Sequence, residues 1–151
     1  MTIETRLKEL GITLPEPSTA VANYLPVVED AGLITVSGQL PMRDGQLAYT
    51  GYVGQDVSVE DAYQAARLCA INGLALIKQA AGSLDRVRIL RVGGFVASAP
   101  GFTGQPKVIN GASDLLVDVL GDRGRHARAA VGVAELPLGA AVEVEFTARI
   151  L

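Results

Sequence analysis

Residues 142–150 alternate strictly between apolar and polar side chains. The apolar positions are every second residue, Val142, Val144, Phe146 and Ala148. The residues between them are polar: Glu143, Glu145 and Thr147. A period of two is typical of a strand with one face on a core and one face open. The chain is therefore expected to build a sheet that its own helices cover on one side.

Two segments have the period of amphipathic helices. Residues 58–82 start with a capping pattern, Ser58 followed by Asp61. One side of this segment is small, at Ala66, Ala70 and Gly73. This narrow side predicts a close approach to a sheet. The second segment, residues 106–120, begins with proline and is followed by glycine, as helices often are.

The remaining elements are short. Residues 1–19 are predicted to form a helical extension, with its helix at 2–10 and Thr2 as its candidate cap, and a connector. Strands are expected at 24–28, 33–36, 46–49, 87–97, 127–134 and 141–150. The first two are expected to pair as a hairpin in which Gly32 can supply a positive φ, and the last two as another hairpin. The sequence predicts one α+β domain over residues 1–151, with a mixed sheet and two main helices on one face. A second copy could cover the other face.

Composition excludes several classes of function. The 151 residues carry a net charge of −3, which disfavours nucleic acid as a partner. There is no stretch of about 20 apolar residues, and the N-terminus is charged, so a cytoplasmic protein without a membrane span is expected. The single cysteine, Cys69, is interpreted as a buried thiol. One histidine, His126, does not make a metal site.

Arg128 is the candidate functional residue that the pattern singles out. In the expected C-terminal hairpin, it shares a face with Glu143 and Glu145, and the rest of that face is Ala and Gly. Small neighbours leave room for a ligand, and a guanidinium matches a carboxylate. Alternatively, Arg128 only pairs with Glu143 or Glu145 across the sheet. His126, two residues earlier, is a candidate pH-sensitive contact.

Three segments carry a resemblance to a known family. Residues 127–149 fit the pattern Ala-Arg-x-x-Val-x-Val-x-x-Leu-Pro followed by an acidic strand. Asn23-Tyr24 leads to Ile-Thr-Val-Ser-Gly-Gln-Leu-Pro at 34–41, and Val-Ile-Asn occupies 108–110. Over residues from about 20 to 151, the chain resembles the reactive intermediate deaminase (Rid, or YjgF) family. The resemblance implies a chorismate-mutase-like fold, a homotrimer with ligand sites between subunits, and no cofactor.

The resemblance also implies an activity, the hydrolysis of 2-aminoacrylate and related enamines or imines to 2-keto acids and ammonia. The positions that match the family's pocket are Tyr24, Gly38, Asn110, Arg128, Ala130 and Glu143. Arg128 would hold the substrate carboxylate, with backbone N–H groups of Gly38 and Ala130. Glu143 would orient the attacking water.

The sequence leaves two difficulties with this site. A hairpin register that pairs Val131 with Val144 separates Arg128 from Glu143 by about 13 Å. A bulge, a long substrate or a neighbouring subunit would resolve the gap, and otherwise Glu145 is the candidate acid. Ala130 also stands where many active members have cysteine, and Leu25 where they have serine.

These departures keep a second hypothesis open, in which the protein is a trimer that binds or senses small carboxylates without catalysis. A ribonuclease, an activity sometimes attached to the family, fits poorly with the acidic charge and the lone histidine.

Overall fold

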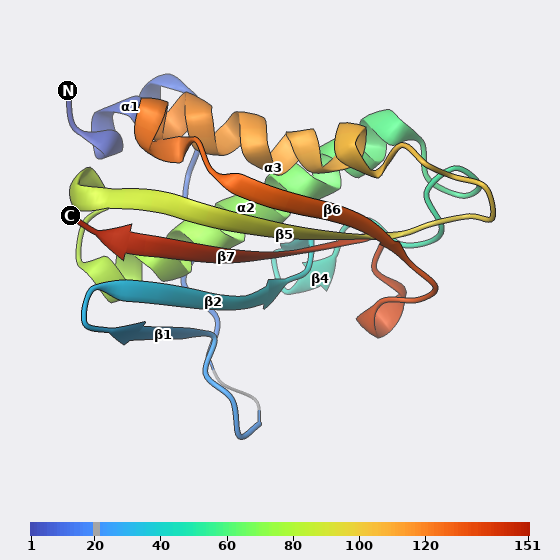
Figure 1. Ribbon diagram of the computed structural model, residues 1–151, viewed down its shortest axis with the longest axis horizontal. Coiled ribbons are helices and arrows are strands. Elements are labelled where there is room, and N and C mark those ends of the chain that lie inside the picture. Colours follow the sequence, from blue (N-terminus) through green and yellow to red (C-terminus); the bar gives the residue numbers. More distant parts are fainter. Residues whose placement is uncertain (20–21) are drawn as a thin grey trace.

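Residues 1–19 and 22–151 are described by a computed structural model (Figure 1). Five strands form the main sheet: β1 (Val27–Asp30), β2 (Leu33–Gln39), β5 (Val87–Ala97), β6 (Ala127–Val133) and β7 (Val142–Ile150). A separate small hairpin joins β3 (Met42–Arg43) to β4 (Gln46–Leu47). The helices are α1 (Ile3–Glu9), α2 (Val59–Ala81) and α3 (Gln105–Leu120), with short 3-10 turns η1 (Leu84–Arg86), η2 (Gly121–Gly124) and η3 (Pro137–Gly139).

The strand order of the main sheet is β1-β2-β7-β5-β6. Only β5 and β6 run parallel, so the sheet is mixed, as predicted. The expected hairpin between the last two strands is wrong. β5 lies between β6 and β7 and bonds to both (Figure 1). The connection through η3 therefore crosses the end of β5 and joins β6 to β7, two strands that are not neighbours in the sheet.

The hairpin of β1 and β2 is confirmed, although the first strand begins at Val27 rather than Tyr24. The turn residues Ala31 and Gly32 have φ of 50° and 83°. Positive φ at both central residues is the geometry of the type I′ turn, whose twist matches that of the strands. The predicted glycine therefore lies where the turn requires it.

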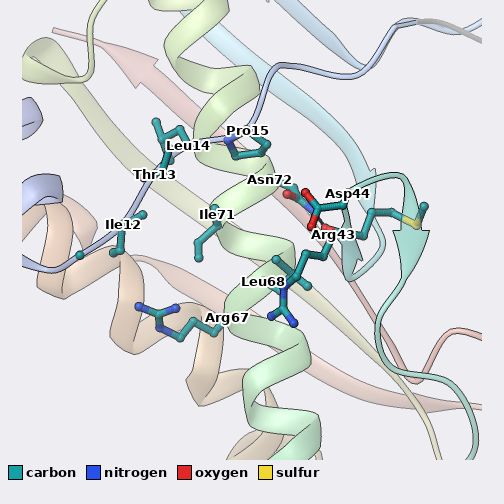
Figure 2. Close-up of a pocket in the computed structure, with 12 residues that line it drawn as sticks. Ile12, Thr13, Leu14, Pro15, Arg43, Asp44, Arg67, Leu68, Ile71 and Asn72 are labelled. Atoms are coloured by element: carbon teal, nitrogen blue, oxygen red, sulfur yellow. Dashed lines mark hydrogen bonds between the residues drawn. The ribbon is translucent and has the colours of Figure 1, made fainter.

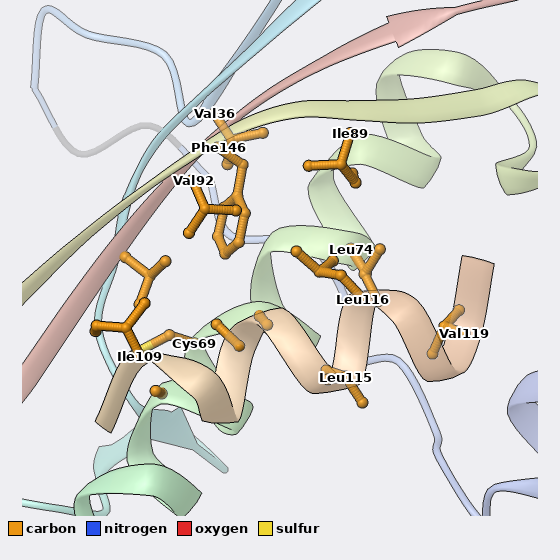
Figure 3. Close-up of a cluster of buried hydrophobic side chains, with 14 of the residues drawn as sticks. Val36, Cys69, Leu74, Ile89, Val92, Ile109, Leu115, Leu116, Val119 and Phe146 are labelled. Carbon is orange, nitrogen blue, oxygen red and sulfur yellow. The ribbon is translucent and has the colours of Figure 1, made fainter. Parts of the chain in front are cut away.

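Both main helices cover the same face of the sheet, as the sequence predicted (Figure 1). The cap of α2 is confirmed, because Ser58 Oγ accepts a hydrogen bond from the Asp61 N–H at 3.1 Å. The small side of α2 packs on β7: a Cβ on Gly73 would lie 2.5 Å from the Phe146 ring. Figure 3 shows this core, in which Phe146 and Val92 project from the sheet toward the helices that carry Leu74 and Leu116.

The N-terminal helix α1 packs at the end of the helical layer. Thr2 caps it as predicted, accepting from the Thr5 N–H at 3.2 Å. Arg6 Nε donates to the Asp118 carbonyl of α3 at 2.8 Å, and Glu4 pairs with Lys78 of α2. Across residues 1–19 and 22–151, the structure contains no helix with the length and apolar character needed to span a bilayer.

The sheet face opposite the helices carries exposed apolar side chains. Val28, Leu33 and Val131 are 48%, 37% and 44% exposed, and Phe95, opposite Val131, is half-buried. Their register places them in rows with Thr35, Arg149 and Glu143, on the side away from α2 and α3. We call this the open face. Water contact with so much apolar surface is unfavourable, which favours a partner on this side.

Candidate functional site

Arg128 lies on the edge strand β6 and reaches toward α3. In the sheet register, Arg128 lies opposite Val92 of β5, and Val92 lies opposite Phe146 of β7. The side chains of Val92 and Phe146 are both in the core. Side chains in one row across a sheet share a face, so Arg128 points to the helical side. Its Nη1 donates to Asn110 Oδ1 at 2.9 Å and to Ser113 Oγ at 3.1 Å. The structure therefore brings Arg128 and Asn110 together.

One edge of the Arg128 guanidinium remains available. Nη1 uses its two hydrogens on α3, and Nη2 makes a long contact of 3.4 Å with the Pro106 carbonyl. Among the described residues, Nε has no assigned acceptor and no carboxylate pairs with Arg128. The Nε–H and one Nη2–H lie on the same edge and form the fork that binds a carboxylate.

The backbone of Ala130 adds a donor beside this edge. Ser98 N donates to the Val133 carbonyl. In a parallel pair of strands, every second residue directs its backbone N–H and C=O groups to the neighbouring strand. Because Val133 bonds to the β5 side, the other odd-numbered residues of β6 also bond to β5. The N–H of Ala130 then points away from the sheet, at its free edge. Arg128 and Ala130 together can hold a carboxylate.

Glu143 lies on the open face, against Gly38. It shares a row with Phe95 and Val131. A Cβ on Gly38 would lie 2.0 Å from Glu143 Oε1, so the carboxylate covers the backbone of β2 where that strand bulges. Burial, and next the neighbouring Glu145 carboxylate, raise the pKa of Glu143 above its usual range. A half-buried carboxylate of this kind is suited to proton transfer.

Arg128 and Glu143 therefore do not share a face, which corrects the expectation from alternation. They point to opposite sides of the sheet and stand on strands separated by β5. The proposed pairing of Arg128 with either glutamate is also wrong: Glu145 pairs with Arg91 at 3.6 Å. Within one chain, a small molecule cannot touch both Arg128 and Glu143.

Tyr24 precedes β1, the strand beside the β2 strand that carries Gly38. It lies in the segment that leads into β1, at the opposite end of the strand order from β6, and is 53% exposed. Ser37 Oγ donates to the Leu25 carbonyl at 2.7 Å and ties this segment to β2. The predicted positions thus fall into two groups, which we call half-sites: an arginine half-site of Arg128, Ala130 and Asn110, and a glutamate half-site of Glu143 and Gly38. Tyr24 lies on the segment before β1.

Sequence reasoning missed one residue of the arginine half-site. Ser113 Oγ lies between Arg128 Nη1 and His126 Nε2, at 3.1 and 2.8 Å. The available signal was its spacing of three from Asn110, because residues three apart on a helix share a face. His126 is half-buried, and burial lowers its pKa. Cys69 is fully buried, as predicted, and burial raises its pKa.

A cavity beside the N-terminal connector lies away from both half-sites. Figure 2 shows a cavity of about 400 Å³ between the N-terminal connector and α2, bordered by Ile12, Leu14, Arg67 and Ile71. Neither Arg128 nor Glu143 lines it. Among residues 1–19 and 22–151, no group of histidine, cysteine or carboxylate side chains is arranged to hold a metal ion. Both half-sites therefore lie outside this cavity.

Known proteins resemble the chain over almost its full length. Residues 4–150 match a family model described as "YjgF/chorismate_mutase-like, putative endoribonuclease". Protein TCP17 of Trypanosoma cruzi is 46% identical over 145 residues, covering 95% of this chain and 91% of that protein.

Two solved structures have the same fold. Atu1372 from Agrobacterium tumefaciens, a protein with unknown function, is 53% identical, with a TM-score of 0.92 over 99% of this chain and 92% of the other. A protein from Shewanella oneidensis, named a putative endoribonuclease, is 36% identical, with a TM-score of 0.95 over 99% of this chain and 100% of the other. The chain belongs to the YjgF/chorismate mutase-like family.

Proposed function

We propose that the protein is a cofactor-independent deaminase that hydrolyses small enamines and imines bearing a carboxylate, such as 2-aminoacrylate, to 2-keto acids and ammonia. The observation that carries the proposal is Arg128, an arginine held by α3 with its carboxylate-binding edge free and the Ala130 N–H beside it. A ligand carboxylate is the group that satisfies this arrangement.

The two half-sites support an active site between subunits. Since Arg128 and Glu143 point to opposite faces of the sheet, one substrate can contact both only if they come from different copies. The open face that bears Glu143 also carries the exposed apolar residues that need cover. A closed ring of copies, which we expect to be a homotrimer, would place the β6 edge of one subunit against the open face of the next.

The chemistry requires little from the protein. The enamine becomes an imine when its carbon takes a proton from water and its nitrogen returns one to water, and the imine carbon is already electrophilic. Water, oriented by the Glu143 carboxylate, forms a bond to this carbon. The carbon–nitrogen bond then breaks, and nitrogen leaves as ammonia with the protons released by the water. Holding the carboxylate and placing one water supply the rate acceleration.

The direct test supplies 2-aminoacrylate continuously from a pyridoxal-phosphate-dependent eliminase and follows the rate at which pyruvate appears. The protein is expected to accelerate this step in proportion to its concentration. Saturable binding of pyruvate without any acceleration would identify the non-catalytic carboxylate-binding trimer instead. Cleavage of RNA by the same preparation, with no effect on 2-aminoacrylate, would contradict the proposal in favour of a ribonuclease.

Glu143→Gln is expected to lower the rate about 100-fold or more while pyruvate binding changes little, because the amide cannot accept a proton from the attacking water. In the unchanged protein, the rate should fall as pH drops through the raised pKa of Glu143, where the carboxylate becomes protonated. A pH–rate profile measured on both proteins checks this. If the rate of Glu143→Gln fell at low pH in the same way as that of the unchanged protein, Glu143 would not be the group that orients the water.

Gly38→Ala is expected to lower the rate about 10- to 100-fold, since the new Cβ would occupy the space of Glu143 Oε1, 2.0 Å from it. Gly38 is exposed, so the fold should tolerate the change. Thermal unfolding and turnover measured together separate the two effects. Loss of stability in parallel with activity would argue against a specific displacement of Glu143.

A further inference from the structure

His126 is connected to the arginine half-site by a directed chain of hydrogen bonds. Its Nδ1 lies 2.6 Å from the Gly124 carbonyl. A carbonyl only accepts, so Nδ1 carries the hydrogen, and Nε2 of the neutral ring is an acceptor. The Ser113 hydroxyl, 2.8 Å away, then donates to Nε2. This leaves the Ser113 oxygen lone pairs for Arg128 Nη1 at 3.1 Å.

We propose that neutral His126 is a positioning residue that holds the Arg128 guanidinium, through Ser113, in the orientation that binds a carboxylate. This inference rests on the proposed function of Arg128. Each group in the chain donates in one direction, from Arg128 to Ser113 to His126 to the Gly124 carbonyl. Hydrogen bonds aligned in this way strengthen one another.

Protonation of His126 would break this order. Nε2 would become a donor, and the Ser113 hydroxyl hydrogen would have to turn away from it. A second positive charge would also stand next to the arginine. Burial, opposed by the Gly124 carbonyl and aided by the Arg128 charge, lowers the pKa of His126 below its usual range. The His126 ring is therefore neutral at neutral pH, which is the form that this series of hydrogen bonds requires.

Several of the other charged groups on the elements around His126 have partners of their own, and Lys107 of α3 and Arg88 of β5 are exposed. These pairs are Arg125 with Asp122 before the strand, Arg123 with the Val87 carbonyl, Asp114 of α3 with Tyr63, and Arg91 of β5 with Glu145. Asp118 is exposed one turn further along α3. Arg128 is the charged residue that acts on the His126 pKa, so the two groups are coupled in both directions.

The chain has one histidine, so its imidazole signal in a nuclear magnetic resonance titration is unambiguous. The guanidinium ¹⁵N and ¹H signals of Arg128 are followed from pH 8 to pH 5 in the same samples. They are expected to shift and broaden with the midpoint of His126. Ser113→Ala should weaken this coupling clearly, because it removes the hydrogen-bond path and leaves only the direct effect of one charge on the other. Arg128 signals that stay constant while His126 titrates would overturn the proposal, with no ligand needed.

Calorimetry with pyruvate adds a functional readout. At pH 8, His126→Phe is expected to bind pyruvate about 10-fold more weakly than the unchanged protein, and His126→Gln, whose amide oxygen can accept from Ser113, should restore most of the affinity. Because pyruvate favours the neutral ring, its binding should lower the His126 pKa further. If pyruvate instead raised the His126 pKa, its carboxylate would simply be attracting the charged ring, and His126 would not be a positioning residue. If the unchanged protein binds no pyruvate, the proposed function fails, and the Arg128 signals alone decide this inference.

Discussion

Arg128→Ala is expected to weaken pyruvate binding about 100-fold or more and to reduce the deaminase rate at least as much. The substitution removes two charge-assisted hydrogen bonds from the Nε–H and Nη2–H edge, each of which contributes about 1.5–3 kcal/mol. Arg128→Lys should recover only a small part of the affinity, because an ammonium has no planar fork. Calorimetry on the unchanged protein, Arg128→Ala and Arg128→Lys measures the pyruvate affinities, and the 2-aminoacrylate assay measures the rates.

Arg125→Ala is the matched control for this experiment. Arg125 is an exposed arginine three residues away that pairs with Asp122, so its loss changes the net charge equally. Its pyruvate affinity should stay within about twofold of the unchanged protein. Equal losses in the two variants would mean that general positive charge, and not the Arg128 fork, attracts the ligand.

Gly111→Ala is expected to destabilise the protein by about 3 kcal/mol or more, although alanine is the better helix former by about 1 kcal/mol. Gly111 lies where α3 crosses α2, and a Cβ there would be 2.0 Å from the Tyr63 carbonyl oxygen. Backbone cannot move aside as a side chain does, so the two helices would have to separate. A loss of stability in Gly111→Ala would thus show that helix packing dominates, and a gain would show that helix propensity does.

Thermal or denaturant unfolding at one fixed protein concentration measures this change. For a chain of this size, the expected loss corresponds to about 6–12 °C in the melting temperature. Asp118→Ala, at an exposed position of the same helix, should change stability by less than about 0.5 kcal/mol. A Gly111→Ala protein as stable as the original would show that the helices are not in tight contact.

The sequence predicted the elements of the fold well, because the signals for them are local. The helix caps at Thr2 and Ser58, the positive φ at Gly32 and the narrow side of α2 all depend on residues within a few positions of one another. The faces of β7 were also predicted correctly, since a strict alternation of Val and Phe with Glu leaves one arrangement.

The sequence determined that one face of β7 is buried and that Arg128 stands in a strand of small residues. It did not determine which strand lies beside which. The tertiary structure placed β5 between β6 and β7 and turned Arg128 toward α3. Alternation relates residues within a strand. Apart from Arg128, β6 has Ala and Gly on one face and Ala and Val on the other, and it has a free edge, so it offers too little contrast to select its side. Pairing with β5 and packing on α3 decided the orientation of Arg128, and with it the division of the candidate site into two halves.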